Sequence, residues 1–273
     1  MIVSASLLLL VVFAWFSFRY AWWARPVSYK HPRILMYHMI SEPRVGARFN
    51  GLRVSPGMFE KQLQWLSQEG WTFVTMHELA SNANDLPEKT VAITFDDGFE
   101  DNYTNALPLL KKYNAKATLY LELDRHDNDW SSKKKSHHDS GELAAETKLS
   151  DEQVFELINS KVFEIGGHTQ THANLSSLNK NEKIAEICEA KVMLENRFDI
   201  KVGSFAYPFG IYADDDILLA EQAGYDSAVI AKGGVETDFC ENKMVASRVK
   251  ISGKDGFFAF KLRMKTGQRG LKK

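Results

Sequence analysis

The segment Val91-Ala-Ile-Thr-Phe-Asp96-Asp97-Gly98 joins an apolar run to two carboxylates and a glycine. The run has the length and composition of a buried strand. In α/β folds with parallel strands, functional side chains gather at the carboxyl ends of the strands, where both aspartates are expected. A turn at Gly98 would let both carboxylates reach one cleft. A helix N-cap or an Asx-turn is the alternative interpretation of the pair.

Around this segment, residues 33–230 alternate short apolar runs with helical patterns, which predicts an α/β fold with parallel strands. This number of β/α units indicates a distorted (β/α) barrel. The expected strands are Ile34–Tyr37, Thr72–Thr75, Val91–Phe95, Ala117–Leu121, Val162–Ile165, Ser204–Tyr207 and Ser227–Ile230. Helices are expected after Ser55-Pro56, over residues 107–113 and over residues 180–196, the last with Ile184, Ile187, Val192 and Leu194 as its buried side.

A second strand runs into Gly166-Gly167-His168-Thr-Gln-Thr-His172. On a helical turn, two histidines four residues apart would lie on one face, as in a two-histidine metal site. With Asp97 they supply two imidazoles and a carboxylate, which suit Zn²⁺ or another first-row divalent metal. Asp96 is then free to take a proton from a metal-activated water.

Two further strands end in residues that could take part in the reaction. In Gly203-Ser-Phe-Ala-Tyr-Pro208-Phe209-Gly210, the backbone N–H that follows the proline could face a developing oxyanion, although a structural turn is the default interpretation. The strand Ile34-Leu-Met-Tyr-His38 ends in an imidazole that could act as a general acid.

Residues 124–148 interrupt the β/α pattern with a polar stretch of mixed charge. A loop of this length is either functional or disordered, and we expect a disordered segment or a mobile lid. Metal binding by its His126, His137 and His138 is the alternative.

Composition excludes some classes of function. The chain is 44% hydrophobic and 25% charged, with a formal net charge of −1. No basic patch alternates with aromatic residues, so no nucleic-acid partner is expected. The two cysteines, Cys188 and Cys240, do not settle the redox compartment.

The N-terminus predicts a membrane anchor over residues 1–24. The 17 uncharged residues from Ile2 to Phe18 would cover ~26 Å as a helix. The start lacks a basic residue and large side chains follow the run, which favours an uncleaved single-pass helix over a cleaved signal peptide. Interfacial side chains would be Trp15, Tyr20, Trp22 and Trp23.

Location in a bacterial inner membrane follows from that anchor. The basic residues Arg19, Arg25, Lys30 and Arg33 follow the run, so the positive-inside rule favours a cytoplasmic domain. The domain plan is an anchor at residues 1–24, a catalytic domain at 25–260 and a basic tail at 261–273, the last either resting on anionic lipid or disordered in solvent.

The order and wording of the motifs resemble the polysaccharide deacetylase family with NodB homology, also called carbohydrate esterase family four. The resemblance covers residues 33–251. Thr94-Phe-Asp-Asp-Gly98 matches the first motif, His168-Thr-Gln-Thr-His172 the second, and Ala206-Tyr-Pro-Phe-Gly210 a variant of the third. Ser55-Pro-Gly-Met-Phe-Glu-Lys-Gln-Leu and Gly70-Trp-Thr-Phe-Val-Thr are similar to the branch that acts on poly-N-acetylglucosamine.

The resemblance implies a NodB-type barrel and a role for each matched residue. Asp96 would be the base, and Asp97, His168 and His172 would bind the metal, Zn²⁺ or alternatively Ni²⁺, Co²⁺ or Fe²⁺. The Phe209 N–H would stabilise the oxyanion. Family members of this kind usually act outside the cytoplasm, opposite to the side that the charges favour.

At two positions the sequence departs from the family pattern, so the partner of the base and the general acid must be other residues. The arginine usually found two residues before the motif-three proline is replaced by Ala206, and Arg248 could take its place. No histidine follows His172, so His38 is expected to be the general acid, as in the Tyr-His branch. Tyr207 is a further candidate for contact with substrate or oxyanion.

The sequence therefore predicts hydrolysis of the N-acetyl group of an amino sugar in a polysaccharide or glycan, with release of acetate. The alternatives are deacylation of a lipid-linked sugar at the inner membrane, and an inactive metal-containing carbohydrate-binding module. A metal phosphohydrolase lacks the further carboxylates or glycine-rich loop that it would need.

Overall fold

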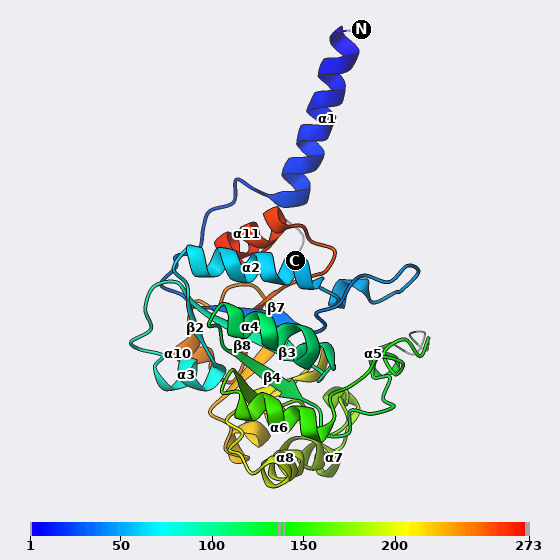
Figure 1. Ribbon diagram of the computed structural model, residues 1–273, viewed down its shortest axis with the longest axis vertical. Helices are drawn as coiled ribbons and strands as arrows, with labels where there is room; N and C mark the ends of the chain where they lie inside the picture. Colours follow the sequence, from blue (N-terminus) through cyan, green and yellow to red (C-terminus); the bar gives the residue numbers. More distant parts are fainter. Residues whose placement is uncertain (1, 136–137, 139, 271–273) are drawn as a thin grey trace.

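The computed structural model describes residues 2–135, 138 and 140–270, and its centre is a parallel β-barrel surrounded by helices (Figure 1). Strand β1 pairs with both β8 and β3, which closes seven strands in the order β1-β8-β7-β6-β5-β4-β3. Strand β2 lies outside this ring, beside the first residues of β3. The strands are β1 (Arg33–Tyr37), β2 (Thr72–Val74), β3 (Thr90–Asp96), β4 (Ala117–Leu121), β5 (Phe163–Gly167), β6 (Ser204–Ala206), β7 (Ser227–Gly233) and β8 (Ala246–Lys250). The predicted distorted (β/α) barrel is confirmed.

The barrel strands are buried on both faces, as β3 shows with seven consecutive buried residues. Alternate residues face the interior, where one cluster joins apolar side chains from six strands, namely Ile34, Ala92, Tyr120, Ala206, Val229 and Ala246. The intervening residues, such as Leu35 and Ile93, pack in the larger cluster that includes residues of the surrounding helices. Inward-facing positions near the carboxyl ends therefore point toward one end of the barrel interior.

The helices follow the expected β/α alternation, and Ser55 caps α2 by accepting a hydrogen bond from Met58 N. Within 180–196 the helix contains a π turn, and Val192 is exposed, contrary to the expected buried side. The helices are α1 (Ile2–Tyr20), α2 (Pro56–Gln68), α3 (Met76–Ser81), α4 (Leu107–Lys112), α5 (Ser131–Lys134), α6 (Asp151–Asn159), α7 (Lys180–Ile184), α8 (Ala190–Phe198), α9 (Asp214–Gln222), α10 (Phe239–Asn242) and α11 (Phe257–Thr266). Two π turns are η2 (Asn102–Ala106) and η4 (Ala185–Glu189), and three 3₁₀ turns are η1 (Asn50–Leu52), η3 (Leu175–Ser177) and η5 (Pro208–Gly210).

The N-terminal helix corrects the predicted membrane location. Helix α1 extends away from the barrel with its C-terminal end beside α11 (Figure 1). Its last turns contact protein, since the Phe16 and Tyr20 rings lie 5.7 and 5.5 Å from the ring of Phe258. Within the described residues, no helix combines the length and the apolar character that crossing a membrane requires. The prediction of a single-pass anchor in a bacterial inner membrane, with the membrane as a partner, is therefore wrong.

The predicted basic tail begins inside a helix. Residues 261–266 belong to α11, which packs against α2 through Trp65 and Phe260, whose ring centroids are 5.8 Å apart.

Candidate active site

The barrel brings the candidate residues together at the carboxyl ends of its strands. Asp96 ends β3, His168 directly follows β5, and Arg248 lies in β8. The turn after β3 already begins at Asp97, whose φ of 76° is left-handed and is followed by 67° at Gly98. This reversal places Asp97 beside the histidines instead of on the far side of the strand.

Asp97, His168 and His172 form a buried triad whose potential ligand atoms all lie within 4.8 Å of one another. One oxygen of Asp97, Oδ1, is 3.4 Å from Nε2 of His168 and 3.3 Å from Nε2 of His172. Among the described residues, neither carboxylate oxygen of Asp97 has a hydrogen-bond partner. Buried carboxylates are normally satisfied, so a charged group facing two imidazoles fits a divalent metal ion as the missing partner.

The two histidines lie on a loop and not on the helical turn that their spacing predicted. Thr169 and His172 adopt left-handed φ values of 66° and 53°. Glu186 of η4 holds the loop by accepting hydrogen bonds from the backbone N–H groups of Gln170 and Thr171, each at 2.9 Å. Backbone strain of this kind persists only where surrounding contacts fix it, as at functional sites.

The histidine rings are held by different partners. Nδ1 of His168 lies 2.7 Å from the Ala206 carbonyl, which leaves Nε2 directed at Asp97. The ring of His172 stacks on Trp130 at 4.5 Å and meets the edge of Phe209 at 4.6 Å. Burial lowers the pKa of His172 to about 4, so the imidazole is neutral near pH 7, as a metal ligand must be.

Charges affect the pKa of His168 and Asp97 differently. Burial lowers the pKa of His168, but the neighbouring carboxylates of Asp97 and Asp96 outweigh it and raise the value. Burial alone would raise the pKa of Asp97, yet the two histidines hold it well below its usual range. Asp97 is thus kept as an anion.

Asp96 forms a buried bidentate ion pair with Arg248. The two guanidinium–carboxylate distances are 2.7 and 2.8 Å, and Arg248 also donates to Thr94 Oγ1 at 3.0 Å. Burial opposes ionisation of Asp96, but the arginine outweighs it and lowers the pKa of the carboxyl group. The structure therefore places Arg248 against the carboxylate of Asp96, the contact expected of it as a substitute for the motif-three arginine.

His38 lies at the same end of the barrel and is half-buried. Asn102 of η2 donates a hydrogen bond to its carbonyl at 2.8 Å, which fixes the backbone there. Burial is the main cause of a lowered pKa of the imidazole, although Asp97 and Asp96 act in the opposite direction.

The third motif contributes a backbone group, while its tyrosine side chain lies elsewhere. Phe209 adopts a φ of 59°, and among the described residues its N–H has no hydrogen-bond acceptor. The ring of Tyr207 instead packs between Phe205 and Tyr212, each 5.0 Å away, so its side chain is not part of the group of residues around the triad.

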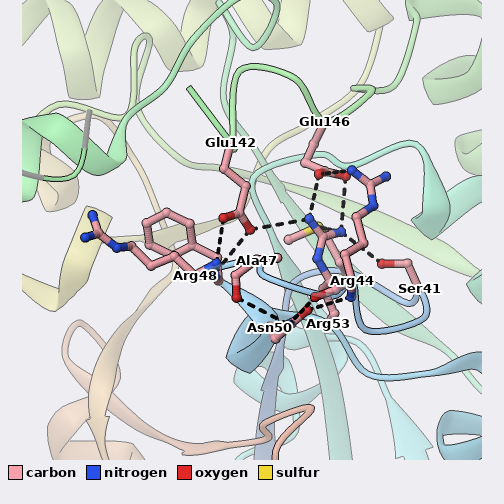
Figure 2. Close-up of polar contacts among 10 residues, drawn as sticks. Ser41, Arg44, Ala47, Arg48, Asn50, Arg53, Glu142 and Glu146 are labelled. Atoms are coloured by element: carbon pink, nitrogen blue, oxygen red, sulfur yellow. Dashed lines mark hydrogen bonds and ion pairs between the residues drawn. The ribbon is translucent and has the colours of Figure 1, made fainter. Parts of the chain in front are cut away.

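The polar stretch 124–148 is structured over its described residues. Glu146 pairs with the buried Arg53 at 2.5 Å and with Arg44 at 2.7 Å, while Glu142 accepts from the backbone N–H of Phe49 at 3.1 Å (Figure 2). We call Arg44, Arg53, Glu142 and Glu146 the loop clasp, because they fasten the segment after β1 to this stretch. Of the two expectations for this stretch, a disordered segment is therefore wrong for the described part, and a mobile lid stays a prediction.

The alternative expectation of metal binding in this stretch finds no second site there. In the described part of the chain, the one group with metal-ligand spacing is the triad, and it includes neither His126 nor His138. His137 lies outside the described residues.

Sequence reasoning missed three groups that support the histidines, namely Trp130, Glu186 and the Ala206 carbonyl. Trp130 was a detectable signal, as a lone aromatic in a polar stretch, but nothing pointed to its contact with His172. Glu186 and the Ala206 carbonyl carry no motif, because their role depends only on the path of the chain.

Comparison with known proteins agrees with this geometry. The sequence model of the family described as polysaccharide deacetylase matches residues 83–228. YxkH of Bacillus subtilis, whose name assigns it to the polysaccharide deacetylases, is 32% identical over 204 residues, which cover 74% of this chain and 64% of that protein. A poly-β-1,6-N-acetyl-D-glucosamine N-deacetylase of Staphylococcus aureus is 29% identical over 188 residues, covering 63% of this chain and 58% of the relative.

The solved structure of the Streptococcus pyogenes deacetylase PplD in complex with acetate superposes with a TM-score of 0.69 and 26% identity, and covers 84% of this chain and 94% of that one. The chain spans less than two thirds of the length of the two curated relatives. The family match extends over more than half of the chain and includes the three triad residues. This chain belongs to the polysaccharide deacetylase family.

Proposed function

We propose that this protein hydrolyses the N-acetyl group of an amino sugar in a polysaccharide and releases acetate, in a reaction that depends on a divalent metal. The observation that carries the proposal is the buried Asp97/His168/His172 triad, with an arginine-paired carboxylate directly beside it. This arrangement separates a metal-binding carboxylate from one that is free to move protons.

The triad would hold the metal through one carboxylate oxygen and the Nε2 atoms of both histidines. Bound there, a divalent metal supplies Lewis acidity, which lowers the pKa of a water molecule and polarises an amide carbonyl. Zn²⁺ is the metal that this donor set suits best, and Ni²⁺, Co²⁺ and Fe²⁺ accept the same ligands.

Asp96 is the general base in this proposal. Its pKa is held low by Arg248, so the carboxylate is ionised and ready to accept the proton of the attacking water. Because Arg248 occupies both carboxylate oxygens, it also fixes the direction in which Asp96 accepts that proton.

Two further groups would act on the acetamide. The Phe209 N–H is available to donate a hydrogen bond to the oxygen that becomes negative as water attacks, an interaction worth about 3 kcal/mol in comparable sites. His38 would give a proton to the nitrogen of the departing amine, so that the C–N bond breaks and the amino sugar leaves. Because burial lowers the pKa of His38, its imidazole would first take up that proton from solvent.

The substrate class follows from the relatives. One relative is named for deacetylation of poly-β-1,6-N-acetyl-D-glucosamine, and a structural neighbour was solved with acetate, the product expected here. A polymer of N-acetylglucosamine is accordingly the substrate that we propose.

The test is acetate release by purified protein from a panel of oligosaccharides, with β-1,6-linked and β-1,4-linked N-acetylglucosamine and N-acetylmuramic acid-containing glycans. Activity that chelation removes and Zn²⁺ restores would support the proposal. Sugar binding without acetate release by the metal-loaded protein would instead favour a carbohydrate-binding module.

A further inference from the structure

Directly beside the metal triad lies a buried ion pair that the proposed mechanism does not use. Lys148 Nζ is 2.8 Å from Glu122 Oε1, and the two side chains are only 3% and 0% exposed. Glu122 follows β4 without a gap, and Lys148 ends the polar stretch 124–148, so the pair joins two segments that are distant in sequence.

Lys148 also contacts the backbone of a triad residue. Its ammonium group donates to the Asp97 carbonyl at 2.9 Å and lies 4.0 Å from the ring centroid of Phe99. Asp97 is the residue with the left-handed φ of 76°, a conformation that a non-glycine residue adopts only when its surroundings impose it. The lysine thus fixes the peptide that sets the direction of the Asp97 side chain.

Glu122 extends the connection to the histidine loop. Asn128 Nδ2 donates to Glu122 Oε2 at 3.3 Å and to the Thr171 carbonyl at 3.0 Å. Thr171 directly precedes His172. A continuous chain of hydrogen bonds therefore runs from Asp97 through Lys148, Glu122 and Asn128 to the residue beside a second triad member.

The segment that carries Lys148 is anchored at its other end as well. The loop clasp holds Glu142 and Glu146 against the segment after β1 (Figure 2). Glu100 N also donates to the Thr147 carbonyl at 3.0 Å, next to Lys148. The ammonium group thus projects from a fixed backbone.

A buried ion pair is weak as a source of stability, because removing both charges from water costs about as much as their attraction returns. The presence of such a pair beside the triad is better explained by the way it fixes the positions of the neighbouring groups. We propose that Lys148 and Glu122 are positioning residues for the metal site, which hold the Asp97 backbone in register with the His172 loop. The inference rests on the metal site of the proposed function.

Zinc affinity of the metal-free full chain, measured by isothermal titration calorimetry, tests this inference. Lys148→Met keeps the apolar stem and removes the donor, and we expect zinc affinity to fall about 10- to 100-fold, as for other residues that orient metal ligands. The visible absorption of the Co²⁺-loaded protein should change too, since it reports ligand geometry and not stability. Lys112→Met, which removes a lysine from the exposed pair with Glu60, is the matched control and should change neither quantity.

Two further variants distinguish the loss of positioning of the metal ligands from the effect of leaving Glu122 as an unpaired buried charge. In Lys148→Met/Glu122→Gln no charge is left unpaired, and zinc affinity should remain weak; recovery to the wild-type value would overturn the inference. Asn128→Ala cuts the chain at a half-buried neutral residue that should not impair folding, and affinity should fall severalfold. Unchanged zinc affinity in Asn128→Ala and Lys148→Met would overturn this inference alone, whereas wild-type protein that binds no zinc would contradict the proposed function and the inference with it.

Discussion

At the scale of single residues, the site separates two adjacent carboxylates by giving them different partners. Asp96 faces the guanidinium of Arg248, and Asp97 faces two imidazoles. Both pKa values are lowered, but of the two carboxylates only that of Asp97 lacks hydrogen-bond partners among the described residues. The neighbouring positions can therefore take different roles, one as a base and one as a metal ligand.

Replacing Arg248 with Met should change the pH dependence of the reaction. Without the arginine, burial of Asp96 is no longer offset and the pKa of its carboxyl group rises. The base must be ionised, so activity is lost as the pH falls through that pKa, and the acidic limb of the profile of kcat/KM should move upward by about one pH unit or more. Arg248→Lys should move it less. If the acidic limb lies at the same pH in the wild type and in both variants, Arg248 does not control the pKa of the base.

His38→Ala should slow the reaction according to the leaving group. An amine leaves only when protonated, so we expect the rate on an N-acetylated sugar to fall about 10²- to 10⁴-fold. An activated acetate ester, such as 4-methylumbelliferyl acetate, has a leaving group that needs no proton, and its hydrolysis should change much less. Equal losses on both substrates, at unchanged zinc content, would remove His38 as the general acid.

At the scale of elements, loops fixed by buried charges build the site on the barrel. The loop clasp holds the segment that follows His38, because Arg53 also donates to Met39 Sδ at 3.2 Å and Met39 pairs with the backbone around Arg53. The side chain of Arg53 is fully buried, and that of Glu146 is 8% exposed. These loops therefore depend on ion pairs that water cannot replace.

Arg53→Met should destabilise the protein by about 1–3 kcal/mol, because Glu146 loses its buried partner and keeps only the ion pair with the exposed Arg44. Urea unfolding followed by circular dichroism measures the free energy of unfolding. Lys112→Met, at an exposed pair, serves again as the control and should leave that free energy unchanged. Equal stability of Arg53→Met and the wild type would show that the clasp contributes nothing to the fold.

Asp101, which lies near the clasp, should make stability depend on pH. Burial raises the pKa of this carboxyl group to about 6, above its unfolded value. The folded state thus binds more protons than the unfolded state between pH 4 and 6. Stability should fall as the pH rises through this window.

Asp101→Asn, a mimic of the protonated form, should raise the free energy of unfolding by about 2–3 kcal/mol at pH 8 and by almost nothing at pH 4. Urea titrations at the two pH values provide the measurement. The same increment at both values would show that Asp101 is not the source of the dependence.

Much of this element-level picture could be predicted from sequence. The seven expected strands formed because β-branched and apolar runs between turn residues specify buried parallel strands. Strand β8 was not predicted, because Ser247, Arg248 and Lys250 interrupt its apolar pattern. In the structure, Ala246 and Arg248 share its inward face. The histidine spacing identified the pair that the structure brings together, but it predicted a helical turn. The segment is a loop instead, in which Thr169 and His172 adopt left-handed φ values.

At the scale of the whole molecule, the barrel explains why residues far apart in sequence meet. Asp96 ends β3, His168 directly follows β5 and Arg248 lies within β8. Because β1 pairs with both β8 and β3, the closed ring brings Arg248 close to Asp96. Motifs could predict the triad, but the outer contacts of Glu122, Lys148 and Glu186 depend on the three-dimensional path of loops. The N-terminal apolar run led to a wrong prediction, because within the described residues no helix has the length and apolar character that crossing a membrane requires.

The central claim is that Asp96 moves the proton while its neighbour Asp97 holds the metal. Acetate release from a β-1,6-linked N-acetylglucosamine oligomer, measured together with zinc content by elemental analysis, tests it in Asp96→Asn. The account predicts one equivalent of zinc, as in the wild type, and a rate lower by about 10²-fold or more. Full zinc content with wild-type acetate release would contradict it.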